Sequence, residues 1–171
     1  MKKPPALVLP PPSTTKTNTN TPALSAAALL GRASGSRSGL AGARVLVVED
    51  DKECRELIRV FLERAAATVF CVDSVAAAMD CVYSSFDPDV VLTDYSMPVA
   101  NGLEFIRQFR KAPSSRAIAV PIIVISGHSE DNWRARSLAA GAADLMTKPF
   151  DPAVLITRIA AAVAPGRSGP H

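Results

Sequence analysis

The stretch Val90-Val91-Leu92-Thr93-Asp94-Tyr95-Ser96-Met97-Pro98 decides how this chain is expected to fold. Its first half is apolar and β-branched, which is typical of a strand that is buried on both faces, as in parallel sheets. The strand ends in the carboxylate of Asp94, and a Met-Pro turn follows at once. Three other apolar runs end in polar residues in the same way: residues 45–48 lead into Glu49-Asp50-Asp51, residues 122–125 into Ser126, and residues 143–147 into Lys148-Pro149.

These strand ends are expected to meet at one edge of one sheet. In open parallel α/β sheets, ligands bind at the carboxyl ends of the strands. Four such strands would therefore deliver carboxylates, a hydroxyl and an ammonium to a common site. This combination of groups suits a divalent cation and a phosphoryl group.

Strand and helix patterns alternate five times between residues 44 and 163. Strands are predicted at residues 44–49, 69–72, 90–94, 121–125 and 144–146. Helices are predicted after Asp51, from Ser74 to about Tyr83, from Gly102 to residues 112–115, over residues 131–140, and from Pro152 after the cap Asp151. The alternation predicts an α/β fold in which helices cover both faces of a parallel sheet, joined by right-handed crossovers.

Charge is distributed unevenly along the 171 residues. The first 43 residues carry five basic side chains and no acidic one, whereas residues 44–163 carry 13 basic and 16 acidic side chains. The net charge of +3 therefore comes from the N-terminal segment, and nucleic-acid binding by the folded part has little support. Residues 1–42 are rich in Pro, Ser, Thr and Ala, so we expect a disordered basic leader, a single domain over residues 43–163, and a frayed tail over 164–171.

The first predicted helix and the cysteines indicate where buried side chains lie. Apolar residues at helical spacing predict a buried stripe, which consists of Cys54, Leu57, Ile58, Phe61 and Leu62. Cys54, Cys71 and Cys81 are odd in number and lack Cys-x-x-Cys spacing, which argues against a disulfide framework or a zinc site. We expect buried thiols. No apolar run reaches the ~18 residues of a membrane helix, and a cytoplasmic location is expected.

Several short motifs, in order and at fixed spacings, resemble the receiver domain of two-component response regulators. The matching pieces are Val47-Val48-Glu49-Asp50-Asp51, Asp94 with Met97-Pro98 and Asn101-Gly102, Ser126-Gly127, and Gly141-Ala142-Ala143-Asp144 leading into Lys148-Pro149-Phe150. The resemblance covers roughly residues 43–163. It implies a flavodoxin-like three-layer (βα)5 sandwich with strand order 2-1-3-4-5, which would place the first strand beside the third.

With that strand order, three carboxylates would adjoin one another and repel unless a cation lies between them. Oxygen ligands suit Mg²⁺, which keeps several waters. Asp50 and Asp94 are assigned as direct ligands and Glu49 as a ligand acting through water. The resemblance adds the backbone carbonyl of Ser96. Asp51 is expected to cap the first helix instead.

Asp94 is the expected phosphoacceptor, because a carboxylate can attack phosphorus and form an aspartyl phosphate. Phosphoryl transfer needs compensation of the charge on the transferring oxygens, which Lys148 would supply beside the cation. The family has a cis bond at the Lys148-Pro149 step. Ser126 would donate a hydrogen bond to a phosphoryl oxygen, although a hydroxyl there could also be only a turn residue.

The chain departs from the family at a position that matters for signalling. Receivers commonly carry Tyr or Phe three residues before the lysine, where this chain has Leu145. In the family a hydroxyl, here that of Ser126, moves toward the phosphate and the aromatic ring turns inward. Leu145 has no ring to turn. His128 and Ser96 would flank the path of an attacking water, and Trp133 belongs either to the core or to a partner surface.

The resemblance implies a stand-alone receiver in a phosphorelay. A histidine kinase or histidine phosphotransfer protein would donate the phosphoryl group, and the face formed by the fourth helix, fifth strand and fifth helix would signal through protein contacts. Alternatives are a phosphorylation-independent interaction module and a receiver fragment of a hybrid histidine kinase. A magnesium-dependent aspartyl phosphatase is disfavoured, because that class places its nucleophile after the first strand with a second Asp two residues on. Here Ser96 takes that second position.

Overall fold

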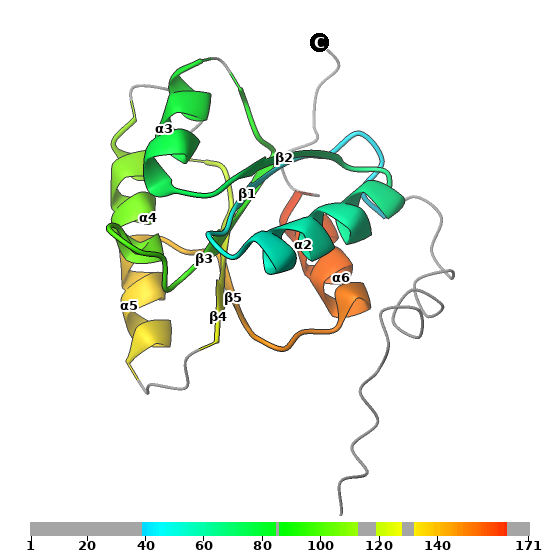
Figure 1. The fold of residues 1–171 in the computed structure, drawn as a ribbon. Coiled ribbons are helices and arrows are strands. Elements are labelled where there is room, and N and C mark those ends of the chain that lie inside the picture. Colours follow the sequence, from blue (N-terminus) through cyan, green and yellow to red (C-terminus); the bar gives the residue numbers. More distant parts are fainter. Residues whose placement is uncertain (1–38, 85, 113–118, 128–131, 164–171) are drawn as a thin grey trace, which may run out of the picture.

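The computed structural model describes residues 39–84, 86–112, 119–127 and 132–163 of the chain (Figure 1). Expectations for residues 1–38, His128 and the tail lie outside these residues. The helix that was expected to close at residues 112–115 ends earlier, at Arg110. The strands are β1 (Arg44–Val48), β2 (Thr68–Val72), β3 (Val90–Asp94), β4 (Ile122–Ser126) and β5 (Asp144–Thr147). The helices are α2 (Lys52–Arg64), α3 (Val75–Tyr83), α4 (Gly102–Arg110), α5 (Trp133–Ala140) and α6 (Pro152–Val163).

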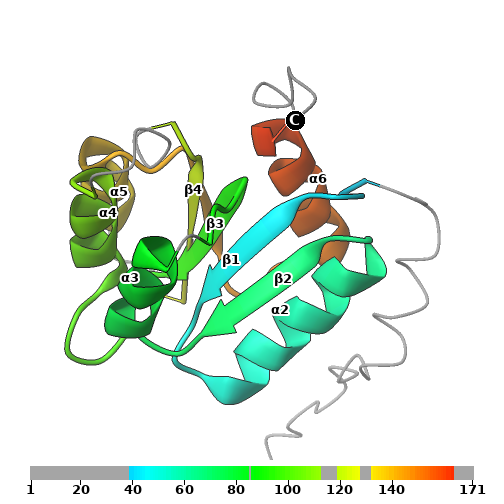
Figure 2. The ribbon, with the colours of Figure 1, turned by 90° about the horizontal axis from the view of Figure 1, so that it is seen from above.

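The five strands form one parallel sheet in the order β2-β1-β3-β4-β5, which confirms the predicted topology. Figure 1 and Figure 2 show α3, α4 and α5 on one face of the sheet and α2 and α6 on the other. The central strands β3 and β4 are buried along their whole length, as the apolar runs predicted. Two apolar layers therefore enclose the sheet and hold its strand ends in register.

Side chains near the helix starts explain why the helices begin where they do. The carboxylate of Asp51 accepts a hydrogen bond from the backbone N–H of Cys54, and Ser74 and Asn101 cap α3 and α4 in the same way. Asp151 accepts from the N–H of Ala153 at 2.7 Å at the start of α6. Each cap satisfies an N–H group that has no partner within its helix.

Three details differ from the sequence-based expectations. Leu57 is 39% exposed because α2 turns this position away from the sheet, so its place in the buried stripe was wrong. The three cysteines are only half-buried, and for Cys71 the reason is that β2 is an edge strand with incomplete cover. Finally, Leu40 is 1% exposed and its N–H donates to the carbonyl of Ala65, so the packed fold extends N-terminal to residue 43.

Trp133 belongs to the core. It is 3% exposed at the start of α5, and its ring lies 5.7 Å from that of Tyr95, centroid to centroid. The predicted start of this helix at residue 131 lies outside the described residues. No helix within the described part of the chain combines the length and the apolar character that a membrane crossing requires.

Candidate functional site

Strand register brings the predicted site residues to the carboxyl edge of the sheet. Val48 of β1 pairs with Thr93 of β3, so the residues that follow Val48 adjoin Asp94 at the end of β3. On the other side, Asp94 pairs with Ile125 of β4, and Ser126 pairs with Thr147 of β5. Carboxylates, a hydroxyl and the lysine after β5 therefore meet although they lie far apart in the sequence.

The loop between β1 and α2 carries the acidic pair Glu49-Asp50, and hydrogen bonds to its backbone hold it in place. Nη1 of Arg55 donates hydrogen bonds to the carbonyl of Glu49 at 2.6 Å and to that of Asp50 at 3.1 Å. Because Asp51 caps α2 and Arg55 lies in its first turn, both ends of the loop are tied to the helix start. Arg55 is not among the site residues expected from the sequence. The only signal was a basic residue four positions after a capping acid.

The Asp94 carboxylate is buried and both of its oxygens have partners. Asp94 is 5% exposed, Oδ1 lies 2.7 Å from Nζ of Lys148, and Oδ2 accepts a hydrogen bond from the N–H of Ser96 at 2.5 Å. Nζ of Lys148 also donates to Oε2 of Glu49 at 2.7 Å. One ammonium therefore links two buried carboxylates that come from neighbouring strands.

Burial and ion pairing shift the pKa values of Glu49 and Lys148 in opposite directions. Burial raises the pKa of Glu49, and the nearby Lys148 only partly offsets this effect. Burial alone would lower the pKa of Lys148, but its hydrogen bonds with Asp94 and Glu49 outweigh burial and raise the pKa above its ordinary value. We conclude that Lys148 stays protonated at neutral pH and supplies a fixed positive charge beside Asp94.

Three carboxylates have the arrangement that a hard cation requires. Glu49, Asp50 and Asp94 each offer an oxygen, and these oxygens lie within 4.8 Å of one another. Asp50 is exposed at the rim, whereas the other two are buried. A cation that binds few carboxylates and keeps several waters, as Mg²⁺ does, fits this half-open cluster.

The segment from Lys148 to Pro149 is attached to β4. The Lys148-Pro149 peptide bond is cis, as expected, and the N–H of Lys148 donates to the carbonyl of Ser126 at 2.7 Å. Ser126 is fully buried at the strand end. Leu145 is 5% exposed and packs in the apolar layer that contains Trp133. It therefore fills core space beneath the site.

Gly102 approaches the phosphoacceptor position more closely than the motif alone indicated. Its N–H donates to the carbonyl of Tyr95 at 3.0 Å, and a Cβ at this position would collide with the backbone carbonyl of Asp94. From the sequence alone, Gly102 is expected only as part of a motif and as a helix start. Its physical role is to let α4 begin directly against the end of β3.

This fold and site are those of a phosphoacceptor signalling domain, and comparison with known proteins agrees. Residues 45–160 match the family described as the response regulator receiver domain, so the chain belongs to that family. Receiver domains are signalling proteins that work with histidine kinases or phosphotransfer proteins and bind Mg²⁺ at an acidic pocket. The cluster of Glu49, Asp50 and Asp94 fits such a pocket.

Two curated relatives illustrate the match. The phosphate regulon transcriptional regulatory protein PhoB of Escherichia coli is 32% identical over 118 residues, which cover 69% of this chain and 50% of PhoB. The cell cycle transcriptional regulator CtrA of Caulobacter vibrioides is 34% identical over 120 residues, which cover 70% of this chain and 50% of CtrA. The chain thus spans about half the length of the curated relatives it matches.

Solved structures show the same fold. The receiver domain of a histidine kinase from Syntrophus aciditrophicus is 25% identical with a TM-score of 0.68, covering 75% of this chain and 96% of that one. The receiver domain of sensor histidine kinase PA1611 from Pseudomonas aeruginosa is 27% identical with a TM-score of 0.65, covering 72% and 99%. The latter structure contains a magnesium ion coordinated in the active site cleft.

Proposed function

We propose that Asp94 accepts a phosphoryl group from a phosphohistidine on a histidine kinase or phosphotransfer protein. A carboxylate oxygen of Asp94 forms the new bond to phosphorus, the P–N bond of the donor breaks, and the imidazole leaves and is protonated from solvent. The observation that carries this proposal is the contact between Asp94 and the Lys148 ammonium at 2.7 Å in a buried cluster.

Lys148 is proposed to compensate charge on the transferring phosphoryl oxygens. Its ammonium already bridges Asp94 and Glu49, so little rearrangement is needed when negative charge accumulates there. Ser126 at the end of β4 is proposed to donate its hydroxyl to a phosphoryl oxygen. Ser126 ends β4 and Lys148 directly follows β5, and both of these strands lie on the same side of β3.

Asp50, Asp94 and Glu49 are proposed to hold Mg²⁺, with Glu49 acting through water and the backbone carbonyl of Ser96 completing the protein ligands. The geometry of the three carboxylate oxygens supports this assignment. The cation would supply charge neutralisation for the incoming phosphoryl group. The carboxylates would then no longer depend on Lys148 alone for compensation of their charge.

The output is proposed to pass through protein contacts on the face formed by α5, β5 and α6. Each of these two helices carries an exposed apolar side chain, Leu138 on α5 and Val154 on α6. Ser126 and Thr147 are paired between β4 and β5, so a shift of the Ser126 hydroxyl toward a phosphate acts directly on β5. Leu145 on the same strand would transmit the change by repacking against the core.

The proposal predicts phosphorylation without multiple turnover of small substrates. The test is intact-protein mass spectrometry after incubation with acetyl phosphate or phosphoramidate, which has the same P–N bond type as phosphohistidine. Wild type with Mg²⁺ should gain one phosphoryl group. Asp94→Asn, and wild type in EDTA, should gain none.

Asp51→Asn is the matched control. Asp51 is an acid in the same loop, but it caps α2, and Asn caps helices equally well, so phosphorylation should persist. A folded wild-type protein that gains no phosphoryl group from either donor or from a phosphorylated histidine protein would contradict the proposal. That result would favour a phosphorylation-independent interaction module.

A further inference from the structure

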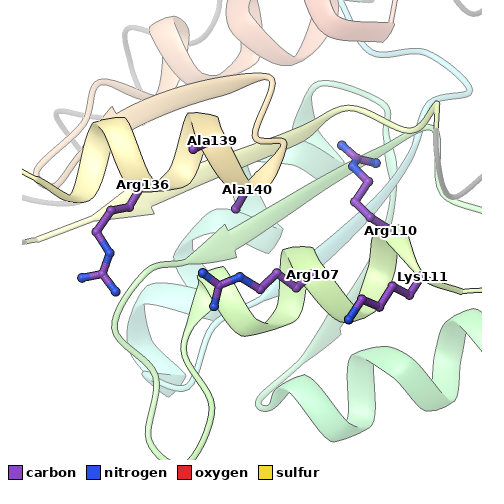
Figure 3. A pocket seen from close by; sticks show the side chains of 6 residues that line it. All are labelled: Arg107, Arg110, Lys111, Arg136, Ala139 and Ala140. Atoms are coloured by element: carbon purple, nitrogen blue, oxygen red, sulfur yellow. The ribbon is translucent and has the colours of Figure 1, made fainter.

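A pocket of about 390 Å³ lies between α4 and α5 (Figure 3). We call it the basic groove, and it is lined by Arg107, Arg110, Lys111, Arg136, Ala139 and Ala140. Four of these six residues are basic and none is acidic. The folded region as a whole carries more acidic than basic side chains, so this concentration of cations is a local property.

Arg110 is a fixed part of the groove. Its Nη1 donates to the carbonyl of Val120 at 2.8 Å and its Nη2 to the carbonyl of Gly141 at 2.9 Å. These contacts join the end of α4 to the segments that precede β4 and follow α5. Carbonyl oxygens are neutral acceptors, so these two bonds orient the guanidinium without cancelling its charge.

The other three cations are exposed and lie on two helices. Arg107 and Lys111 belong to the end of α4, and Arg136 extends from α5 on the other side of the groove (Figure 3). Nη1 of Arg107 lies 3.9 Å from Oε2 of Glu104, which is a long and exposed pair that contributes little. Among the residues that the structure describes, no carboxylate forms an ion pair with Lys111 or Arg136. A positive potential therefore collects in a concave surface.

Basic residues at helix ends have a simpler explanation, because cations in the last turn interact favourably with the helix dipole. This explanation applies to Arg107 and Arg110, which lie in the last turn of α4. It does not apply to Arg136, which lies in the middle of α5. It also does not explain why alanines at positions 139 and 140 leave a hollow between the charged side chains.

We propose that the basic groove binds a small anion carrying two or more phosphate groups, of the pyrophosphate or nucleoside diphosphate class. The volume falls in the range of small-molecule sites. The exposed guanidinium groups of Arg107 and Arg136 offer paired donors that match phosphate oxygens, and the Lys111 ammonium adds a third exposed cation. A docked protein segment is less well suited, because the core of a protein interface needs apolar area and the apolar lining here is two alanine side chains.

The test is isothermal titration calorimetry of the full chain with pyrophosphate and with ADP, in EDTA so that the carboxylate site cannot recruit either anion through a cation. Arg107→Gln and Arg136→Gln should each weaken binding by about tenfold or more, since each removes a charge-assisted contact. Ala139→Leu fills the groove without changing charge, and it should also weaken binding. Tighter binding of ADP would indicate a nucleoside diphosphate and equal binding an inorganic polyphosphate; both support the proposal.

Two arginines outside the groove serve as matched controls. Arg134 lies on α5 like Arg136, but its guanidinium lies over the Trp133 ring, 5.3 Å from the centroid, and Arg64 ends α2 on the other face of the sheet. Arg134→Gln and Arg64→Gln should leave binding within about twofold of wild type. Absence of saturable binding, or equal losses in these controls, would overturn the proposal. So would tighter binding of an acidic peptide through the same residues, which would identify a protein partner instead.

Discussion

The backbone carbonyl of Asp94 lies so close to Gly102 that no side chain fits between them. The phosphoacceptor strand β3 and the start of α4 are therefore in direct backbone contact. This contact fixes where the loop between them begins and ends. It also makes the geometry of the loop depend on a residue that has no side chain.

Gly102→Ala should destabilise the fold by about 2 kcal/mol or more, because the added methyl group forces the end of β3 away from α4. Urea denaturation monitored by circular dichroism measures the change. Gly127→Ala is the control, since a Cβ there meets nothing within 4 Å, and it should cost less than about 0.5 kcal/mol. An equal loss of unfolding free energy in Gly102→Ala and Gly127→Ala would contradict this interpretation.

Mg²⁺ should raise the thermal unfolding temperature by binding the carboxylate cluster of the folded chain only. At a concentration about 100 times the dissociation constant the stabilisation is about 2.7 kcal/mol. Asp50→Asn should reduce the shift strongly without disturbing the core, because Asp50 is exposed. A full Mg²⁺ shift in Asp50→Asn would show that the cation binds elsewhere.

Val99→Asn should stabilise the protein by about 1 kcal/mol. Val99 has φ of 69° and is fully exposed, so a β-branched residue occupies the left-handed region without any packing gain. Asn adopts this conformation more readily. Val99→Ile keeps the strain and should leave the free energy of unfolding unchanged, and a stabilisation of both variants would point to a cause other than backbone strain.

Ser137→Ala should be neutral or should stabilise by up to about 1 kcal/mol. The Ser137 hydroxyl is fully buried in α5 and has no hydrogen-bond partner among the residues that the structure describes. Replacing it removes a desolvated polar group and adds a better helix former. Ser74→Ala, which removes the cap of α3, should instead cost about 1 kcal/mol. A clear loss for Ser137→Ala would reveal a partner for this hydroxyl.

Alkylation of Cys71 should be slow in the folded protein, and its rate should keep rising as the pH is raised to high values. Burial raises its pKa to about 11, so at pH 8 the thiolate fraction is about a hundredfold below that of a thiol with the ordinary value. Mass spectrometry of iodoacetamide-treated protein, followed by peptide mapping, gives the rate at each pH. In urea the Cys71 thiol is no longer buried, so its alkylation rate should level off near pH 9. The same levelling in the folded protein, with circular dichroism unchanged, would contradict the prediction.

Most of the fold could be predicted because local signals agreed with the global pattern. The runs before Asp94 and Ser126 are rich in β-branched residues, and Asp51, Ser74 and Asp151 mark helix starts. Predicted and observed boundaries of the described elements therefore differ by no more than two residues, except at the end of α4, which was expected at residues 112–115 and lies at Arg110. The candidate site could be located because strand ends of a parallel sheet meet at one edge. Its individual roles remain predictions that the phosphorylation experiment tests.

What the sequence did not predict depends on packing between distant segments. The exposure of Leu57 follows from the rotation of α2 on the sheet, which helical spacing does not define to within one residue. The partial exposure of Cys71 follows from its edge strand. The basic groove combines residues of α4 with residues of α5 that lie 25 to 33 positions later, and these become neighbours only because α4 packs beside α5.

The bridge from Lys148 to Glu49 and Asp94 has a consequence for protein synthesis. Both carboxylates leave the ribosome well before the lysine that neutralises them. A chain that lacks residue 148 but has paired β1 with β3 would bring these two acids together without their ammonium partner. The cluster therefore acquires its full set of charges only after β5 has been made and has docked, which places Lys148 beside both carboxylates.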